Sequence, residues 1–263
     1  MANMGLGICA HRGRLIPNLP GNTLLDFQGV CELGVKWIET DVCFTAPDED
    51  GSQEPIIHHP NPSDCSDPSH IKWKYLKPKL NPKVLSLNNF LAFLKVNSSL
   101  SCLLELKEDS DKLVDAVVKK ITEYKLENRV YITVFQMRIH SLRLEASARL
   151  IARARSQNPK IKIHLIVMFP FSLPRLTHRY HPDIISVGWL PGSKLSTWLF
   201  KGFLVNTINL KKQIRKAQEM GVEIIGGIAN DRKDFDYLVS LNVDGIMTDD
   251  SVAAVKFLKE KSS

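Results

Sequence analysis

The sequence predicts a (β/α)₈ TIM barrel, and two observations lead to that fold. Short apolar runs rich in β-branched residues alternate with helical patterns along the whole chain of 263 residues, and eight of these runs have the length of strands. Eight strands alternating with helices over about 250 residues are typical of this barrel. We therefore expect one barrel domain over residues 1–263, with an open, doubly wound sheet as the structural alternative.

The eight expected strands are short and mostly apolar. They are Gly5–Ala10, Trp37–Phe44, Cys102–Lys107, Val130–Phe135, Ile161–Met168, Ile184–Val187, Glu223–Ile228 and Asp244–Met247. The expected helices are Asn22–Leu33, Leu87–Leu94, Lys112–Glu127, Met137–Arg155, Thr207–Met220, Lys233–Leu241 and Val252–Lys259. The pattern defines the crossover after Val187 poorly. Residues 46–82 are rich in Pro, Asp, Ser and Asn, which predicts a long insertion after the second strand, and such loops are commonly functional.

The composition, with 44% hydrophobic and 24% charged residues, is that of an ordinary globular protein. The net charge of +7 fits a phosphate-bearing substrate, an anionic membrane or nucleic acid, or simply a solvated basic surface. No apolar run is long enough for a transmembrane helix, and the first residues do not resemble a signal peptide. Five cysteines without a C-x-x-C pair favour a reduced protein. We expect a cytoplasmic protein, with peripheral membrane contact left open.

Three carboxylates are expected at the mouth of the barrel. Glu39 and Asp41 alternate along the second strand and therefore point the same way, and Glu105 and Lys107 do so on the third. Acidic side chains on an inward face need a cation, a protein partner or a raised pKa. Hard oxygen ligands suit one Mg²⁺ or Ca²⁺ ion. The alternative is an ion pair of Lys107 with Glu105 or Asp41, without a metal.

Histidines and an arginine complete the candidate site. His11 and Arg12 follow the first strand, and His58 and His59 follow Pro55-Ile56-Ile57 on the return from the insertion. Histidine can exchange a proton near neutral pH, and arginine can bind two oxygens of a phosphodiester at once. Arg12 and Lys107 are the expected substrate-binding residues.

At these residues the chain resembles the glycerophosphodiester phosphodiesterase family. The matching segments are Ala10-His11-Arg12-Gly13, Asn22-Thr23, Glu39-x-Asp41, Glu105-Leu106-Lys107 and Val243–Asp249. The resemblance implies that two histidines act as acid and base and that three carboxylates hold one divalent cation. The matching residues are His11 and His59, and Glu39, Asp41 and Glu105.

A second branch of that superfamily, the sphingomyelinase D / phospholipase D toxins, is similar at 38–44 and at 59–65. In the toxin register the loop histidine is His59; a His-Asp-Pro register would make it His58, and we choose His59. Three features depart from these patterns. Gly21 stands where Glu is usual, Gly227-Ile228-Ala229 replaces a Trp-Thr-Val segment, and the C-terminal tail of the toxins is absent.

The resulting expectation is a metal-dependent phosphodiesterase that cleaves glycerophosphodiesters by histidine acid/base catalysis. The alternative enzyme is a phospholipase D acting on lysophospholipids or sphingolipids, with a cyclic phosphate as one possible product. The aromatic and apolar segments Trp189–Pro191 and Trp198–Leu204 favour it if they line the entrance, although a core-packing helix would read the same way. A non-catalytic phosphate- or lipid-binding barrel is the third hypothesis, and no nucleic-acid partner is expected.

Overall fold

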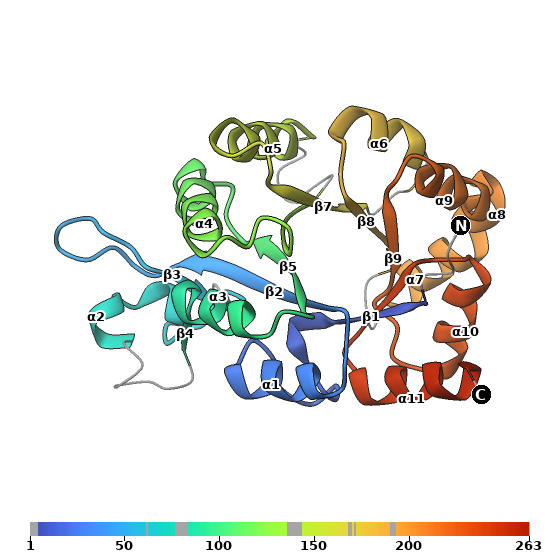
Figure 1. Cartoon of the computed structure of the whole chain (residues 1–263), viewed down its shortest axis with the longest axis horizontal. Helices are drawn as coiled ribbons and strands as arrows, with labels where there is room; N and C mark the ends of the chain where they lie inside the picture. Colours follow the sequence, from blue (N-terminus) through green and yellow to red (C-terminus); the bar gives the residue numbers. More distant parts are fainter. Residues whose placement is uncertain are drawn as a thin grey trace.

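A computed structural model of the chain describes residues 5–61, 63–76, 84–135, 144–167, 170, 172–189 and 193–262. Within this range, the side chains at 144–147, 194, 203–206 and 262 are not described. Eight parallel strands form a closed ring in the order β1-β2-β5-β6-β7-β8-β9-β10, and β1 pairs with β10 to complete it. Helices surround the ring, which confirms the (β/α)₈ barrel (Figure 1).

The barrel strands lie close to their expected positions. They are β1 Gly7–Ala10, β2 Trp37–Phe44, β5 Ser101–Leu106, β6 Val130–Phe135, β7 Lys162–Val167, β8 Ile184–Val187, β9 Glu223–Gly226 and β10 Gly245–Thr248. Several predicted ends differ by one or two residues; β1, for example, begins at Gly7 rather than at Gly5. Lys107 follows β5 rather than ending it, and Ile228 lies beyond the end of β9. Met168, predicted to end the fifth strand, lies outside the described residues.

The helices agree less closely with the sequence prediction. They are α1 Leu24–Glu32, α3 Leu87–Val96, α4 Asp111–Tyr124, α5 Leu144–Gln157, α6 Leu173–Tyr180, α7 Lys194–Trp198, α8 Val205–Ile208, α9 Leu210–Glu219, α10 Arg232–Ser240 and α11 Ser251–Ser262. The π-helix η3, Leu199–Leu204, joins α7 to α8 in the crossover that the pattern left undefined. The prediction missed α6, where Pro174 occupies the first turn, a position that tolerates proline. Residues 137–143 of a predicted helix lie outside the described residues.

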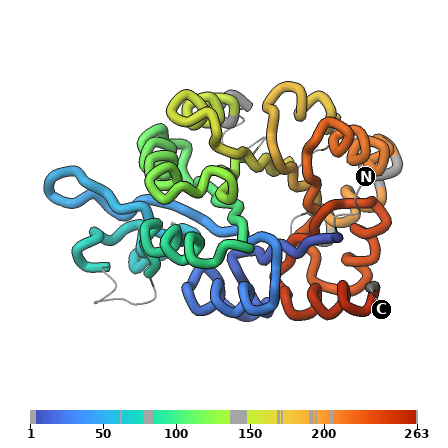
Figure 2. Tube along the Cα trace, viewed as in Figure 1, coloured from blue at the N-terminus to red at the C-terminus, as the bar shows by residue number. Residues whose placement is uncertain are grey.

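The insertion after β2 has some structure of its own. The strand β3, Pro55–Ile57, pairs antiparallel with the end of β2, and β4, Leu85–Ser86, pairs with β3. The 3₁₀-helix η2, Pro68–His70, and α2, Trp73–Leu76, lie between them. The chain trace in Figure 2 shows this segment extending beyond the ring of helices. Because β3 pairs with β2, the residues that follow β3 lie beside the mouth of the barrel.

Alternation along β2 separates the core from the site. Ile38 and Val42 pack outward with buried residues of the surrounding helices. Trp37 points inward with Leu103, Tyr131 and Ile225. The ring of Trp37 fits because Gly7 and Gly245 have no side chain there; a Cβ at either glycine would lie within 2.7 Å of it. The lower interior is therefore filled, and the inward residues further along β2 lie toward the mouth.

The helices and the cysteines bear on whether the chain crosses a membrane and whether it forms disulfides. In the described part of the chain, no helix combines the length and the apolar character needed to cross a membrane. All five cysteines are free, and three of them, Cys9, Cys43 and Cys102, are buried. Burial raises the pKa of the Cys43 thiol and keeps it in its unreactive protonated form.

Candidate active site

Three buried carboxylates meet inside the mouth of the barrel. Asp41 on β2 is in register with Glu105 on β5, and Glu39 lies one inward position below Asp41. One oxygen from each of the three side chains lies within 4.8 Å of the other two. Burial, together with the neighbouring charges of Asp41 and Glu105, raises the pKa of Glu39 well above its ordinary value. The sequence prediction that these three acids converge is confirmed, and the cluster could hold a metal ion.

Two basic side chains contact the same cluster. The Nζ atom of Lys107 lies 2.7 Å from Glu105 Oε1 and 3.2 Å from Asp41 Oδ1, and Arg12 Nε lies 3.4 Å from Asp41 Oδ2. These cations hold the pKa of Asp41 below its ordinary value despite its burial. Both ion pairs that the sequence analysis gave as the alternative to a metal are therefore present. Yet two cations do not balance three carboxylates, and the pKa of Glu39 stays raised.

The Asn22-Thr23 segment positions Asp41 and opens α1. Asn22 Nδ2 donates to Asp41 Oδ2 at 2.9 Å, while its Oδ1 accepts from Thr40 Oγ1 at 2.7 Å. Thr23 caps the helix by accepting from the backbone N–H of Asp26. Gly21 has a φ of +75°, and a Cβ there would lie 2.7 Å from the backbone oxygen of Arg12. This backbone therefore leaves no room for the glutamate that is usual at this position.

His11 lies between two acids. Its Nδ1 is 2.7 Å from Asp249 Oδ1, and its Nε2 is 3.7 Å from Glu39 Oε2. Asp249 also accepts from Arg14 Nη1 at 2.6 Å and from Asn230 Nδ2 at 3.1 Å, and these bonds hold its pKa low despite its burial. An ionised carboxylate only accepts, so Nδ1 of His11 carries the proton of this bond. The other nitrogen, Nε2, faces the carboxylate cluster.

The two adjacent histidines of the loop after β3 have different surroundings. His58 Nε2 lies 2.9 Å from Asp67 Oδ2, and Asp67 also accepts from the backbone N–H groups of Asn61 and Ser69. His58 thus takes part in holding the loop together. His59 is half-buried, and burial, aided by the charges of Lys107 and Arg12, lowers its pKa to about 4 against the opposing effect of Asp41. Of the two, His59 is therefore the one whose charge environment is that of the carboxylate cluster.

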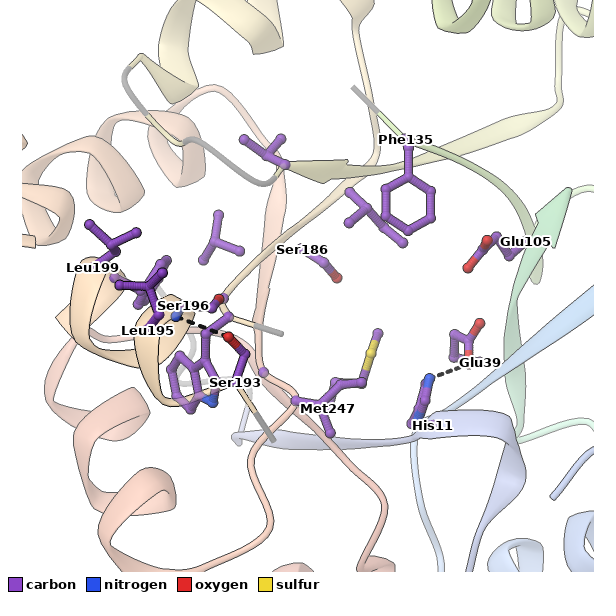
Figure 3. Close-up of a pocket in the computed structure, with 18 residues that line it drawn as sticks. His11, Glu39, Glu105, Phe135, Ser186, Ser193, Leu195, Ser196, Leu199 and Met247 are labelled. Carbon is purple, nitrogen blue, oxygen red and sulfur yellow. Dashed lines mark hydrogen bonds and ion pairs between the residues drawn. The ribbon is translucent and has the colours of Figure 1, made fainter. Parts of the chain in front are cut away.

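A cavity of about 360 Å³ begins at the carboxylates and extends across the mouth (Figure 3). His11, Glu39 and Glu105 line one end. The rest of the wall is mainly apolar and comes from β7, β8, α7 and η3, with Phe135, Ile228 and Met247. Trp189 and Phe200 are buried and in ring contact at 5.5 Å, whereas Trp198 is 63% exposed. The segment Trp198–Leu204 is thus part core and part surface. Leu190 and Pro191 and the side chains of Phe203 and Leu204 lie outside the described set.

Sequence analysis missed several residues that hold the site in place. Asp249 and Asn22 lie in segments that it quoted, but neither was given a role; an acid directly after the last strand was the available signal. A buried chain across the barrel was also missed, in which His164 Nδ1 lies 2.9 Å from Thr133 Oγ1 and Nε2 lies 2.7 Å from Ser186 Oγ. Burial lowers the pKa of His164 to about 3, so it is neutral at ordinary pH. Its signal was one histidine within an apolar strand.

Comparison with known proteins places the chain by fold. A scan against models of protein families gave no match, and neither did a search of curated protein sequences. Solved structures do match. A glycerophosphodiester phosphodiesterase from Parabacteroides distasonis superposes with a TM-score of 0.72 and 15% identity, covering 98% of both chains. One from Thermotoga maritima gives 0.69 and 17%, covering 96% of this chain and 98% of the other.

A third solved structure was obtained with a bound product. It is a phosphodiesterase from Oleispira antarctica in complex with sn-glycerol-3-phosphate, with a TM-score of 0.66 and 16% identity, covering 98% of this chain and 97% of the other. The fold is thus that of phosphoric diester hydrolases with a (β/α)₈ barrel. More narrowly, it is the fold of the glycerophosphodiester phosphodiesterases.

Proposed function

We propose that this chain, as one barrel domain over residues 1–263, is a metal-dependent phosphodiesterase that cleaves glycerophosphodiesters. The observation that carries the proposal is the cluster of Glu39, Asp41 and Glu105, buried at the mouth beside two histidines, an arginine and a lysine. Active sites of such barrels lie at this face. The fold shared with glycerophosphodiester phosphodiesterases supports the same reaction class. The free cysteines of this chain suit a reducing, cytoplasmic setting.

The residues present fit a divalent cation. Glu39, Asp41 and Glu105 would hold it, and an all-carboxylate donor set suits Mg²⁺ or Ca²⁺. The raised pKa of Glu39 arises first from burial and then from the charges of Asp41 and Glu105, and a bound cation would lower it by favouring the ionised carboxylate. When bound, the cation would offset the negative charge that develops on a phosphoryl oxygen.

Arg12 and Lys107 would bind and orient the phosphodiester. Both carry their positive charge within 3.4 Å of Asp41, on the rim of the cluster where a phosphoryl group would lie. Each is partly exposed, at 25% for Arg12 and 18% for Lys107, so both can reach a ligand in the mouth. Binding the two non-bridging oxygens would hold the phosphorus in line with the attacking oxygen.

The two histidines would divide the proton transfers. His59 is neutral at pH 7 because its pKa is lowered to about 4, so it can accept the proton of the attacking hydroxyl or water. His11 would then deliver a proton from Nε2 to the leaving alcohol, while Asp249 holds its Nδ1–H and fixes the ring. The attacking group can be water or a glycerol hydroxyl next to the phosphate, and the latter gives a cyclic product.

The test is phosphorus NMR of the products formed from glycerophosphocholine with Mg²⁺ or Ca²⁺ added. We expect a phosphomonoester or a cyclic phosphate, and no conversion when a chelator is in excess. Absence of any product with either cation would contradict the proposal and favour a barrel that only binds phosphate or lipid. Full activity in excess chelator would leave a phosphodiesterase but overturn the metal.

A second candidate reaction is a phospholipase D cleavage of lysophospholipids or sphingolipids. The specific observation that favours it is the apolar wall of the cavity next to the carboxylates. The catalytic groups would be the same, and only the substituent of the phosphate would differ. Peripheral contact with a membrane would then bring the enzyme to its substrate, and a vesicle-binding assay with and without anionic lipid would test that contact.

A further inference from the structure

A buried histidine lies between two hydroxyl groups in the barrel interior. His164 on β7 places Nδ1 2.9 Å from Thr133 Oγ1 on β6 and Nε2 2.7 Å from Ser186 Oγ on β8. Thr133 and His164 are both 0% exposed, whereas Ser186 is 8% exposed. Of the three, Ser186 is the one that lines the mouth cavity. These residues form the His164 network, which connects the interior to the cavity wall.

The His164 network can point in two directions. Because the ring of His164 is buried and neutral, it carries one N–H and therefore donates to one hydroxyl and accepts from the other. In the first direction, Thr133 Oγ1 donates to Nδ1, and Nε2 donates to Ser186 Oγ. In the second direction, Ser186 Oγ donates to Nε2, and Nδ1 donates to Thr133 Oγ1. The two directions differ in which hydroxyl hydrogen lacks an acceptor.

Burial of Thr133 selects the first direction. In the second direction the hydroxyl hydrogen of Thr133 would have no acceptor, because His164 is its one hydrogen-bond partner in the described part of the chain. A fully buried donor without an acceptor costs free energy. In the first direction the hydrogen without a protein acceptor is that of Ser186, and water or a ligand in the cavity can accept it. The hydrogen bonds therefore run from Thr133 through His164 to Ser186.

The hydroxyl of Ser186 lies across the cavity from the carboxylates. His164 is in register with Ile184, and Ser186 follows two residues further along β8, which places it nearer the mouth. Figure 3 shows its oxygen pointing into the space between Ser186 and the two acids Glu39 and Glu105. A ligand with its phosphoryl group at the carboxylates would therefore bring its alcohol part to Ser186.

We propose that Ser186 donates a hydrogen bond to an oxygen in the alcohol part of the bound phosphodiester, and that Thr133 and His164 hold Ser186 in this donor orientation. The inference rests on the proposed phosphodiesterase function and adds residues that position its substrate. Ser186 would contact the substrate, whereas Thr133 and His164 act through Ser186. An oxygen buried beside Ile166 and Met247 loses water, and the hydroxyl of Ser186 would replace that hydrogen bond. The site would thus favour an alcohol part with a hydroxyl oxygen over a hydrocarbon of the same length.

Nitrogen-15 NMR of the histidine rings measures the direction of the His164 network without requiring a ligand. The two neutral tautomers of histidine give different shifts for their ring nitrogens, and loss of one signal pair in His164→Asn assigns His164. We expect Nε2 to carry the proton and Nδ1 to be unprotonated. A proton on Nδ1 would overturn the proposal, because Ser186 would then donate to the ring and not to a ligand.

Calorimetry with sn-glycerol 3-phosphate and with propyl phosphate, which lacks the two hydroxyls, tests the contact with Mg²⁺ or Ca²⁺ present. The ratio of the two affinities should fall about 2–10-fold in Ser186→Ala, the usual size of one neutral hydrogen bond. Ser186→Thr keeps the hydroxyl and should keep most of the ratio. The matched control is Ser240→Ala on α10, where the hydroxyl bonds to the backbone oxygen of Tyr237 outside the cavity. An equal ratio in the wild type and Ser186→Ala would overturn the proposal.

Turnover of glycerophosphocholine separates this inference from the function on which it rests. Ser186→Ala should raise KM with little change in kcat, because the hydroxyl holds a part of the substrate away from the reacting phosphorus. If the wild type hydrolyses the diester and Ser186→Ala has the same KM, the role of Ser186 is refuted and the phosphodiesterase stands. If the wild type hydrolyses nothing while the affinity ratio still falls in Ser186→Ala, the catalytic proposal fails and Ser186 remains a binding residue of the mouth.

Discussion

The two ends of the mouth cavity are held in place by different forces. At the acidic end, β1, β2 and β5 present groups joined by directional bonds, such as those of Asp41 with Asn22 and Lys107. At the apolar end, β7, β8 and the α7–η3 segment present side chains held mainly by packing, such as Phe200 against Trp189. A charged site requires residues of fixed type at fixed places, whereas packing accepts many apolar residues of similar volume. Under the proposed function, the acidic end would determine the chemistry, and the apolar end could vary with the substrate.

The largest effect is expected from the carboxylates. Glu39→Gln, Asp41→Asn and Glu105→Gln each remove an anionic oxygen, so each should weaken Mg²⁺ or Ca²⁺ binding by more than about tenfold and bring turnover close to the level in chelator. Calorimetric metal titration and the ³¹P assay measure the two effects. Glu32→Gln on the exposed face of α1 is the control. Metal binding that is unchanged in all three variants would show that the cluster is only an ion-pair network.

The raised pKa of Glu39 predicts the direction in which the stability of the metal-free protein changes with pH. Between the ordinary pKa of a glutamate and this higher folded value, the folded state holds a proton that the unfolded state has released. Stability should therefore fall as pH rises through that window. Glu39→Gln should remove this loss and melt at a higher temperature than the wild type at neutral pH without metal. A lower melting temperature would mean that Glu39 stabilises the fold by itself.

The histidines should come next in size. His11→Ala or His59→Ala should each lower kcat by about 10²–10⁴-fold, the usual contribution of a general acid or base. His58→Ala should act through the loop, because it removes the partner of Asp67, and should lower the melting temperature more than kcat. If His58→Ala instead lost nearly all activity while His59→Ala stayed nearly normal, His58 would be the catalytic histidine of the loop. The proposed acid/base mechanism would remain the same.

The acidic end was readable from the sequence because the relevant signals are local. Glu39 and Asp41 two residues apart on a strand must share a face, and parallel neighbours place Glu105 beside them. What the sequence could not show is the partner of each group. Asp249 and His11 are 238 residues apart and meet only because β10 closes the barrel against β1. The separate surroundings of His58 and His59 likewise depend on the fold of the insertion.

The apolar end was not readable in the same way. A leucine buried in the core and a leucine that lines a cavity follow the same periodicity. The sequence pattern therefore allowed Trp198–Leu204 to be either a core-packing helix or part of the cavity entrance. The structure divides the segment, because η3 turns Phe200 inward while Trp198 stays outside. The helix α6 was missed, and the crossover that contains α7 was left undefined, for a different reason: short helices with a proline or a polar start carry little periodic signal.

His164 is fully buried behind the cavity-lining Ser186, and it gives a smaller, pH-dependent effect. Its pKa of about 3 in the folded state lies below the ordinary value near 6.5, so between these pH values the unfolded chain binds a proton that the folded chain does not. Stability should fall as pH falls through this range, by up to about 1.4 kcal/mol per pH unit from this group. Denaturant unfolding of His164→Asn against the wild type should show the difference shrinking with acidity. A constant difference would mean that His164 is protonated inside the barrel.

The smallest effect on stability is expected for Trp198, at the rim of the apolar end. Comparing it with the nearby Phe200 distinguishes a surface position from a core position. Trp198 is 63% exposed, so Trp198→Ala should change the free energy of unfolding by no more than about 0.5 kcal/mol. Phe200 is 2% exposed and packs on Trp189, so Phe200→Ala should cost about 3–5 kcal/mol, which is on the order of 10 °C in melting temperature. Equal losses would mean that both aromatics belong to the core. The α7–η3 segment would then be a structural cap, and the rim would have no exposed aromatic to meet a lipid. A near-neutral Trp198→Ala instead leaves this position free to vary with the substrate, as the contrast between the two ends requires.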